Sequence, residues 1–122
     1  MKKMLLSINP EFVELIFSGE KEYEFRKSIA KQGPTKIIIY STSPVSAVVG
    51  EALIESVIVN DPEIVWEATK LSAGIDRSFF NEYYSNRSRA VAYKLTDVKQ
   101  YKETKKLSDF GLSHAPQSFV YV

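Results

Sequence analysis

Three charged residues that lie close together in the sequence, Lys21, Glu24 and Arg26, are the first candidates for chemistry. The planar guanidinium of Arg26 can make a two-point contact with a phosphate or with the edge of a base. The carboxylate of Glu24 can accept a hydrogen bond from an exocyclic amine. Lys21 can act as a point charge or, if desolvated, as a base. Charges that alternate along a strand more often form a solvated face, so the stretch predicts either a charged pocket wall or an ordinary exposed strand.

A second polar segment follows an apolar run and leads toward Glu51. It consists of Tyr40, Ser41, Thr42 and Ser43. The backbone amides and hydroxyls of such a loop can face a ligand, and the Tyr40 ring can stack on a base. The alternative is a turn held by local hydrogen bonds from the hydroxyls to the backbone. We treat these residues and Glu51 as further binding candidates.

A third polar segment contains the single histidine, His114, and ends with Gln117 and Ser118. Side chains that directly precede a strand can be aimed at the mouth of a barrel. A loop with a lone histidine is more often only a loop. Gln117 and Ser118 are therefore binding candidates, whereas His114 is not.

The composition excludes several kinds of site. The sequence contains no cysteine and one histidine, so disulfides, thiolate metal ligands, a cysteine nucleophile and a zinc site built from histidines alone are impossible. The glycine motifs of phosphate and dinucleotide sites are absent, as are common hydrolase motifs. No apolar run approaches the ~20 residues of a membrane helix. We expect no metal, no cofactor, no membrane partner and a cytoplasmic location, which the lack of cysteine suits.

The charge balance argues against bulk attraction to nucleic acid. Lys and Arg number 16 and Asp and Glu number 15, which gives a net charge of +1. A protein that holds nucleic acid mainly by phosphate contacts usually carries a basic excess. Any binding of nucleic acid must therefore come from a local patch or pocket.

Strand and helix signals predict a single α+β domain over residues 1–122. We expect strands at 3–8, 21–27, 36–40, 47–59, 89–101 and 119–122, and helices at 10–18, 61–70 and 76–84, with 102–118 mostly loop. Strands outnumber helices and do not alternate with them regularly. This pattern favours a small mixed or antiparallel β-barrel with about three flanking helices over a doubly wound sheet.

Local signals refine these elements. Asn9, Asp61 and Asp76 are predicted N-caps, and Gly19 is a predicted left-handed C-cap. Gly50 suits a bulge or a close approach of two segments. The aromatic residues of the last predicted helix are spaced to bury one of its sides; they are Phe79, Phe80, Tyr83 and Tyr84.

Several segments resemble ASCH domains, which are named for homology to a human activating signal cointegrator. The similarity is carried by residues 5–11 (LLSINPE), 19–26 (GEKEYEFR), 40–44 (YSTSP), 50–51 (GE), 107–111 (LSDFG) and 115–119 (APQSF). The later segments are similar to small prokaryotic members described as predicted transcriptional regulators. The order of these segments makes the resemblance fairly specific along almost the whole chain.

The resemblance implies a PUA-like fold and a cleft between the first helix and the barrel, proposed for RNA or nucleotide binding. Lys21 and Arg26 match the basic motif of that cleft. One enzymatic branch, the bacterial 4-acetylcytidine amidohydrolases, uses a Lys, a Thr and a Glu. Lys21 matches the Lys, but Glu24 stands in place of the Thr, and residues 72–76 hold no matching Glu.

The leading hypothesis is a module that binds nucleic acid, with RNA as the first choice, or a nucleotide, without catalysis and with a role in regulation of transcription. Arg26 is assigned to a phosphate or base edge, Lys21 to a phosphate and Glu24 to a base edge. We expect Arg26→Ala to weaken binding without unfolding the domain. The alternatives are an amidohydrolase that acts on a modified nucleoside through Lys21 and Glu24, and a domain that binds a protein partner.

Overall fold

A curled six-stranded sheet organises the protein, whose computed structural model describes residues 2–122. Residue 1 of the predicted domain 1–122 lies outside the described residues. The strands are β1 (Lys3–Ile8), β2 (Tyr23–Arg26), β3 (Lys36–Ser41), β4 (Ala47–Asn60), β5 (Ala90–Lys105) and β6 (Phe119–Tyr121). The α-helices are α1 (Pro10–Ser18), α2 (Pro62–Thr69) and α3 (Arg77–Tyr83), and short 3-10 helices cover Lys70–Ser72 and Leu107–Phe110.

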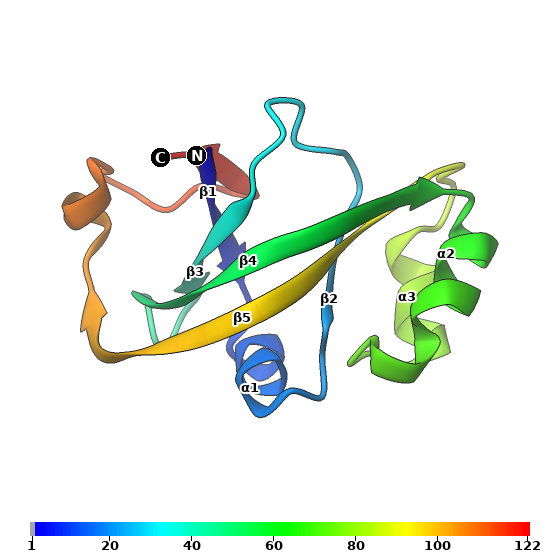
Figure 1. Cartoon of the computed structure of the whole chain (residues 1–122), viewed down its shortest axis with the longest axis horizontal. Coiled ribbons are helices and arrows are strands. Elements are labelled where there is room, and N and C mark those ends of the chain that lie inside the picture. Colours follow the sequence, from blue (N-terminus) through cyan, green and yellow to red (C-terminus); the bar gives the residue numbers. More distant parts are fainter. Residues whose placement is uncertain (1) are drawn as a thin grey trace.

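The strands follow the order β2-β5-β4-β3-β1-β6, so that β2 and β6 form the two edges of the sheet. β1 and β3 run parallel, and the other neighbours are antiparallel. Figure 1 shows the long strands β4 and β5 crossing over the rest of the sheet, with α1 at one side and α2 and α3 together at one end. This curled half-barrel with three α-helices confirms the predicted fold class.

The apolar side chains form three groups. A central core lies between the sheet and α1, and includes Leu6, Ile16, Ile39 and Tyr93. An end core joins α2 and α3 to β2 and β5, and includes Phe25, Val65, Trp66 and Phe80. An outer cluster on the opposite face of the sheet consists of Leu5, Ile38, Tyr40 and Val48, with partly buried residues of segment 107–122 packed on it. Both faces of the central strands are thus covered, which explains their continuous apolar runs.

The helix boundaries agree with the predictions, although two of the caps work differently. Gly19 has a φ of 88° and ends α1 in the left-handed conformation, as predicted. The Asp76 carboxylate accepts a hydrogen bond from the backbone N–H of Phe79 at 2.8 Å. Asn9 and Asp61 stand at the predicted cap positions, but their side chains make no capping hydrogen bond. No helix among residues 2–122 has the length and apolar character needed to span a bilayer.

Two strands differ from the predicted ranges. β5 continues to Lys105, so residues 102–105 are strand and not loop. These residues are exposed and three of the four are charged, but the strand ends in pairing with the start of β4, where Val48 lies opposite Lys105. β2 begins only at Tyr23, so Lys21 precedes the strand. The side chain of Lys21 therefore does not have to point to the face that a strand starting at residue 21 would give it.

Gly50 marks the close approach that was predicted. The pairing of β4 with β5 shifts register between Val48 and Gly50. A Cβ atom at this position would lie 2.5 Å from the carbonyl oxygen of Lys99 and 2.6 Å from the Phe17 ring. The absence of a side chain therefore allows α1 and β5 to approach β4 together.

We expect Gly50→Ala to destabilise the fold, because its methyl group would collide with backbone as well as with a ring. The free energy of unfolding should fall by about 1–3 kcal/mol, the usual cost of overpacking. Urea unfolding measures this change. Gly33→Asn is the control, since nothing lies within 4 Å of a Cβ at Gly33 and asparagine tolerates its positive φ of 63°. An equal loss in both variants would contradict the close approach.

Candidate active site

A pocket of about 180 Å³ opens between α1, β2 and α3. Three segments supply its walls: the end of β1 with the start of α1, the region of β2, and α3 with the residue before its cap. The lining residues are Ser7, Ile8, Asn9 and Phe12, then Lys21, Glu24, Phe25 and Arg26, then Ile75, Phe79 and Tyr83. The structure thus brings the three charged candidates into one cavity. The alternative of a solvated strand face is wrong, because Lys21 is 3% and Glu24 6% exposed.

The Lys21 ammonium is held by one carbonyl and two aromatic rings. Its Nζ donates a hydrogen bond to the backbone oxygen of Ala73 at 2.8 Å. The same atom lies 4.8 Å from the ring centre of Phe25 and 5.4 Å from that of Phe12. Burial lowers the pKa of Lys21, the Glu24 carboxylate opposes this shift, and the Arg26 charge adds to it. Lys21 is therefore a cation whose charged form is disfavoured by its surroundings.

The connection between α2 and α3 fixes the aliphatic stem of Lys21. Gly74 has a φ of 70°, and a Cβ there would lie 2.5 Å from Cβ and 2.6 Å from Cγ of Lys21. The backbone N–H of Glu22 donates to the oxygen of Ser72 at 2.9 Å. Segment 72–74 thus packs along Lys21 and directs its ammonium to Ala73.

The Glu24 carboxylate uses only one of its oxygens within the protein. Arg26 donates to Oε2 from Nε at 3.1 Å and from Nη2 at 2.9 Å. Oε1 makes no hydrogen bond with any described residue, yet it is not sealed from solvent. Glu24 therefore presents one acceptor to the pocket.

Arg26 joins the two edges of the sheet. From β2 its Nη2 donates to the backbone oxygen of Ser7 in β1 at 3.0 Å. Its Nη1 donates to Oγ of Ser118 at 3.2 Å and to the oxygen of that residue at 3.4 Å, directly before β6. With Glu24 as its third partner, the guanidinium is occupied by contacts within the protein.

Several lining residues were not predicted as site residues. Asn9, Phe12 and Tyr83 face the pocket because of the turns of α1 and α3 on which they lie. The hydroxyl of Tyr83 donates weakly to the oxygen of Phe25 at 3.4 Å, and burial raises the pKa of Tyr83. The predicted aromatic face of α3 is in fact divided, since Phe79 and Tyr83 line the pocket whereas Phe80 and Tyr84 enter the end core. The spacing of four between Ile75, Phe79 and Tyr83 is the signal that could have found this second face.

Segment 40–43 reaches the pocket only at its margin. The hydroxyl of Thr42 donates to Oδ1 of Asn9 at 3.4 Å. Tyr40 is 8% exposed and belongs to the outer cluster, and Ser41 is also buried. Ser43 lies in an exposed turn. Of these four residues, Thr42 is the one that touches the pocket wall.

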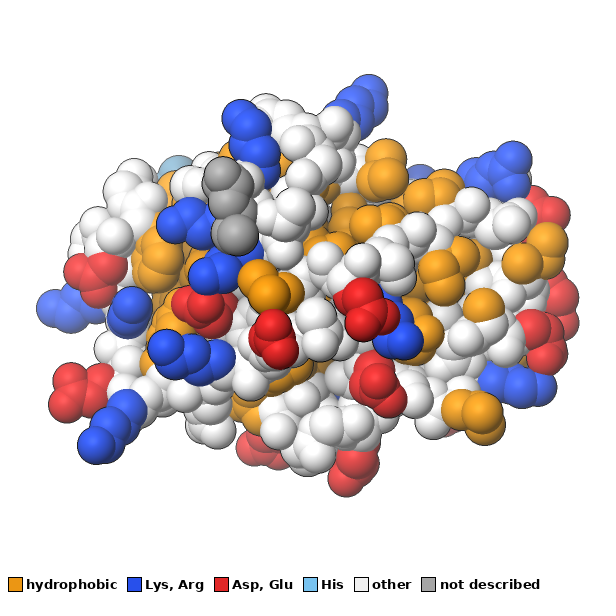
Figure 2. Space-filling model, viewed as in Figure 1, with side chains coloured by type: hydrophobic (Ala, Val, Ile, Leu, Met, Phe, Trp, Pro, Cys, Tyr) orange, Lys and Arg blue, Asp and Glu red, His pale blue; other side chains and the backbone are white. Residues whose placement is uncertain are grey.

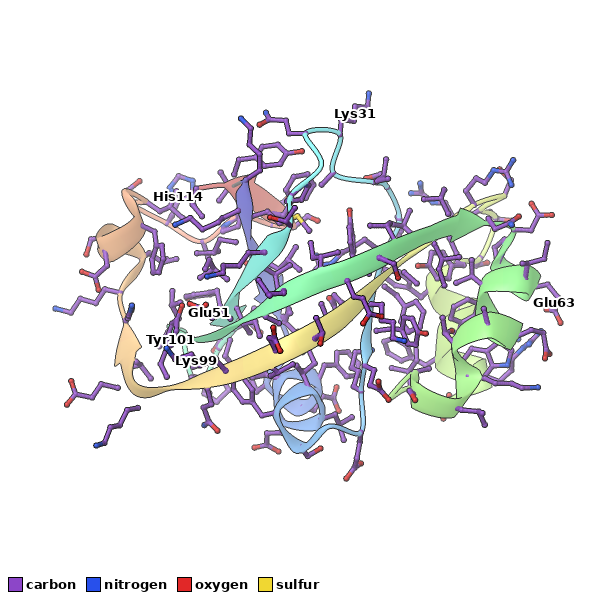
Figure 3. All side chains as sticks on the ribbon, in the orientation of Figure 1. Lys31, Glu51, Glu63, Lys99, Tyr101 and His114 are labelled. Carbon is purple, nitrogen blue, oxygen red and sulfur yellow. The ribbon has the colours of Figure 1, made fainter. Side chains whose placement is uncertain are left out.

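The remaining candidates, Glu51, Gln117 and Ser118, are not among the residues that line the pocket. Glu51 forms an ion pair with Lys36 at 2.8 Å and accepts from the Tyr101 hydroxyl at 2.8 Å. Figure 3 shows Glu51 beside Tyr101 toward one end of β4 and β5, and Tyr101 packs on the outer cluster. Gln117 is exposed and does not line the pocket, whereas Ser118 touches it through Arg26.

Comparison with known proteins identifies the fold family. A family model described as a domain of unknown function, DUF365, matches residues 3–112. A crystal structure of ASCH from Zymomonas mobilis superimposes with a TM-score of 0.88 at 28% identity, over 99% of this chain and 87% of that one. The chain belongs to the DUF365 family and is an ASCH domain. Its half-barrel is accordingly the PUA-like fold that the resemblance implied.

Two relatives have named functions of their own. An ASCH domain-containing ribonuclease from Zymomonas mobilis is 32% identical over 97 residues, which cover 79% of this chain and 66% of the relative. The ATP synthase subunit alpha of Ureaplasma parvum is 30% identical over 120 residues, which cover 98% of this ASCH domain and 15% of that protein. The chain thus spans less than two thirds of either relative.

We expect Arg26→Ala to lower the stability of the domain. The variant would leave Glu24 buried without its partner, which typically costs about 3–5 kcal/mol. Arg89→Ala is the matched control, because the Arg89–Asp61 pair is exposed, at 62% and 61%, and such pairs contribute below about 1 kcal/mol. Urea unfolding compares the two. Equal losses would show that Arg26 does not hold the sheet edges together.

The buried ammonium predicts a pH-dependent stability. Because the folded pKa of Lys21 lies below 10.5, the unfolded chain binds its proton more strongly between the two values, and stability rises with pH across that interval. The free energy of unfolding of wild type should therefore increase relative to Lys21→Met as pH rises toward 10.5. Lys31→Met, on an exposed loop, corrects for effects of removing any lysine. A constant difference between wild type and Lys21→Met would contradict a desolvated Lys21.

Proposed function

We propose that this ASCH domain binds RNA by taking one nucleotide into the pocket between α1, β2 and α3. The observation that carries the proposal is that a buried ammonium and an unused carboxylate oxygen lie in the same cavity. Lys21 supplies a positive charge for a phosphate, and Oε1 of Glu24 supplies an acceptor for an exocyclic amine. A cation and a hydrogen-bond acceptor in one pocket favour a nucleotide, which has a phosphate and an amine, over an apolar ligand.

The size of the pocket favours a single small group. Its volume of about 180 Å³ lies below the range of about 300–1,000 Å³ typical of sites for drug-sized ligands. Aromatic side chains of α1 and α3 border the charged pair, and RNA-binding modules commonly stack unpaired bases on such rings. One base or one nucleotide fits these walls better than a duplex does.

The outer surface supports pocket binding over attraction along a basic face. Figure 2 shows Lys and Arg side chains interspersed with Asp and Glu on the face over β4 and β5, without a continuous field of one sign. The net charge of +1 agrees with this distribution. A protein of this kind is expected to contact few phosphates, so its affinity should fall only slightly with added salt.

Lys21→Met should weaken RNA binding by about 10- to 100-fold, because hydrogen bonds to a charged group contribute about 1.5–3 kcal/mol. Fluorescence anisotropy with short labelled single strands, across a salt series, measures this loss. Lys31→Met, outside the pocket, is the control and should bind as wild type does. The proposal is wrong if wild type binds neither RNA nor nucleotides, or if both variants lose the same affinity.

Hydrolysis at the same pocket is the second candidate, and the desolvated Lys21 favours it. A lysine with a lowered pKa supplies more neutral amine, which can accept a proton from water or from a ribose 2′-hydroxyl. The relative named as a ribonuclease supports RNA as the substrate. Lys21 and Glu24 in one cavity also keep open the amidohydrolase alternative, in which the substrate is a modified nucleoside such as 4-acetylcytidine.

Product analysis separates these activities from binding alone. Mass spectrometry after incubation with RNA would reveal shortened strands, and incubation with 4-acetylcytidine would release acetate. An activity is assigned to this site only if the Lys21→Met variant lacks that activity. Binding without product supports a regulatory module, and a co-purifying protein without affinity for RNA supports the protein-interaction alternative.

A further inference from the structure

Phe79 has an unusual degree of exposure for its position. It is 46% exposed, whereas every other aromatic residue among residues 2–122 is buried or half-buried. The other rings of α3 and its surroundings are buried or half-buried. A single exposed apolar side chain is common on protein surfaces, so the significance of Phe79 depends on what lies beside it.

The ring lies at the mouth of the charged pocket. Phe79 lines the cavity together with Phe12, and the two rings meet edge to face at a centroid distance of 5.4 Å and an interplanar angle of 77°. The Asp76 cap fixes the start of α3 and hence the turn that carries Phe79. The ring is thus held in place from the pocket side while almost half of its surface faces solvent.

We propose that the solvent-exposed side of Phe79, at the mouth of the pocket, forms a second base-binding subsite on which the nucleotide next to the bound one stacks. The ligand class is therefore a single-stranded RNA segment of at least two nucleotides, and a free nucleoside fills only part of the site. Base–aromatic stacking accepts every base, so this subsite adds affinity for chain length without selecting sequence. The inference depends on the proposed function, because it assumes that the pocket takes a nucleotide.

The capacity of the pocket supports a second subsite. Its volume of about 180 Å³ leaves the neighbouring base of a bound strand outside the cavity. An unstacked base seeks an aromatic surface, and the exposed side of Phe79 adjoins the opening. No other exposed aromatic ring in the described part of the chain competes for this role.

The test compares affinities for a mononucleotide and for di- and trinucleotides by isothermal titration calorimetry. Wild type should bind the longer ligands about 5- to 100-fold more tightly, the range that one stacked base provides. Phe79→Leu keeps apolar volume but removes the ring, and it should abolish this gain with length, whereas the affinity for the mononucleotide should fall by less than the lost gain, since Phe79 also lines the pocket. Phe79→Trp should retain the gain. Leu71→Ala, at a residue that is 95% exposed and outside the pocket, should behave as wild type.

The outcomes distinguish this inference from the proposed function. If wild type binds the mononucleotide but gains nothing with length, or if Phe79→Leu keeps the gain, the second subsite does not exist. If Phe79→Leu weakens mononucleotide binding equally, Phe79 is a wall of the first site and the inference is again wrong. If wild type binds none of the ligands, the proposed function itself fails. Thermal unfolding of each variant confirms that affinities are compared between folded proteins.

Discussion

The ion pair between Arg26 and Glu24 is the interaction on which the rest of the structure depends. A curled sheet with two free edges must join them or leave polar backbone exposed between them. Arg26 joins them by reaching from β2 to the oxygen of Ser7 and to Ser118. Because Glu24 neutralises the guanidinium through one oxygen only, the same pair leaves an acceptor toward the pocket. The closure of the sheet and the chemistry of the site therefore share the same side chains.

The burial of Lys21 destabilises the folded state. Lys21 is 3% exposed, and its ammonium makes one hydrogen bond, to the oxygen of Ala73. This single bond offsets only part of the free energy lost when the ammonium leaves water. The faces of two aromatic rings and the nearby carboxylate compensate part of the loss. The chain also accepts a left-handed glycine, Gly74, so that backbone can pack against the lysine stem. Local rules broken together in one place are typical of a functional site.

Much of the fold could be predicted because its signals are local. Gly19 ends α1 and Asp76 caps α3 through contacts between neighbours in the chain, and the apolar runs of β1 and β3 reflect burial on both faces. The end of β5 could not be predicted in this way, since its charged residues become strand only by pairing with the start of β4. Tyr40 is buried because segment 107–122 packs on the outer cluster, which no local pattern indicates.

The candidate site was predictable in its centre and not at its border. Lys21, Glu24 and Arg26 are close in sequence, so their residue types alone indicated a charged wall. Their burial depends on contacts between distant segments: Arg26 and Ser118 are 92 residues apart. Asn9 and Tyr83 depend on how α1 and α3 are rotated against β2. Such rotations follow from packing of the whole domain and not from the spacing of a few residues.

The pairing of β1 with β6 has a consequence for how this domain can be built into larger proteins. Val122 donates a backbone hydrogen bond to the oxygen of Lys3 at 3.0 Å, so the start of β1 lies beside residue 122 (Figure 1). A unit whose entry and exit points coincide can be placed within a surface loop of a host protein without separating the host's own chain ends. The pairing of β1 with β6 thus makes the domain suitable for insertion into a loop of another protein.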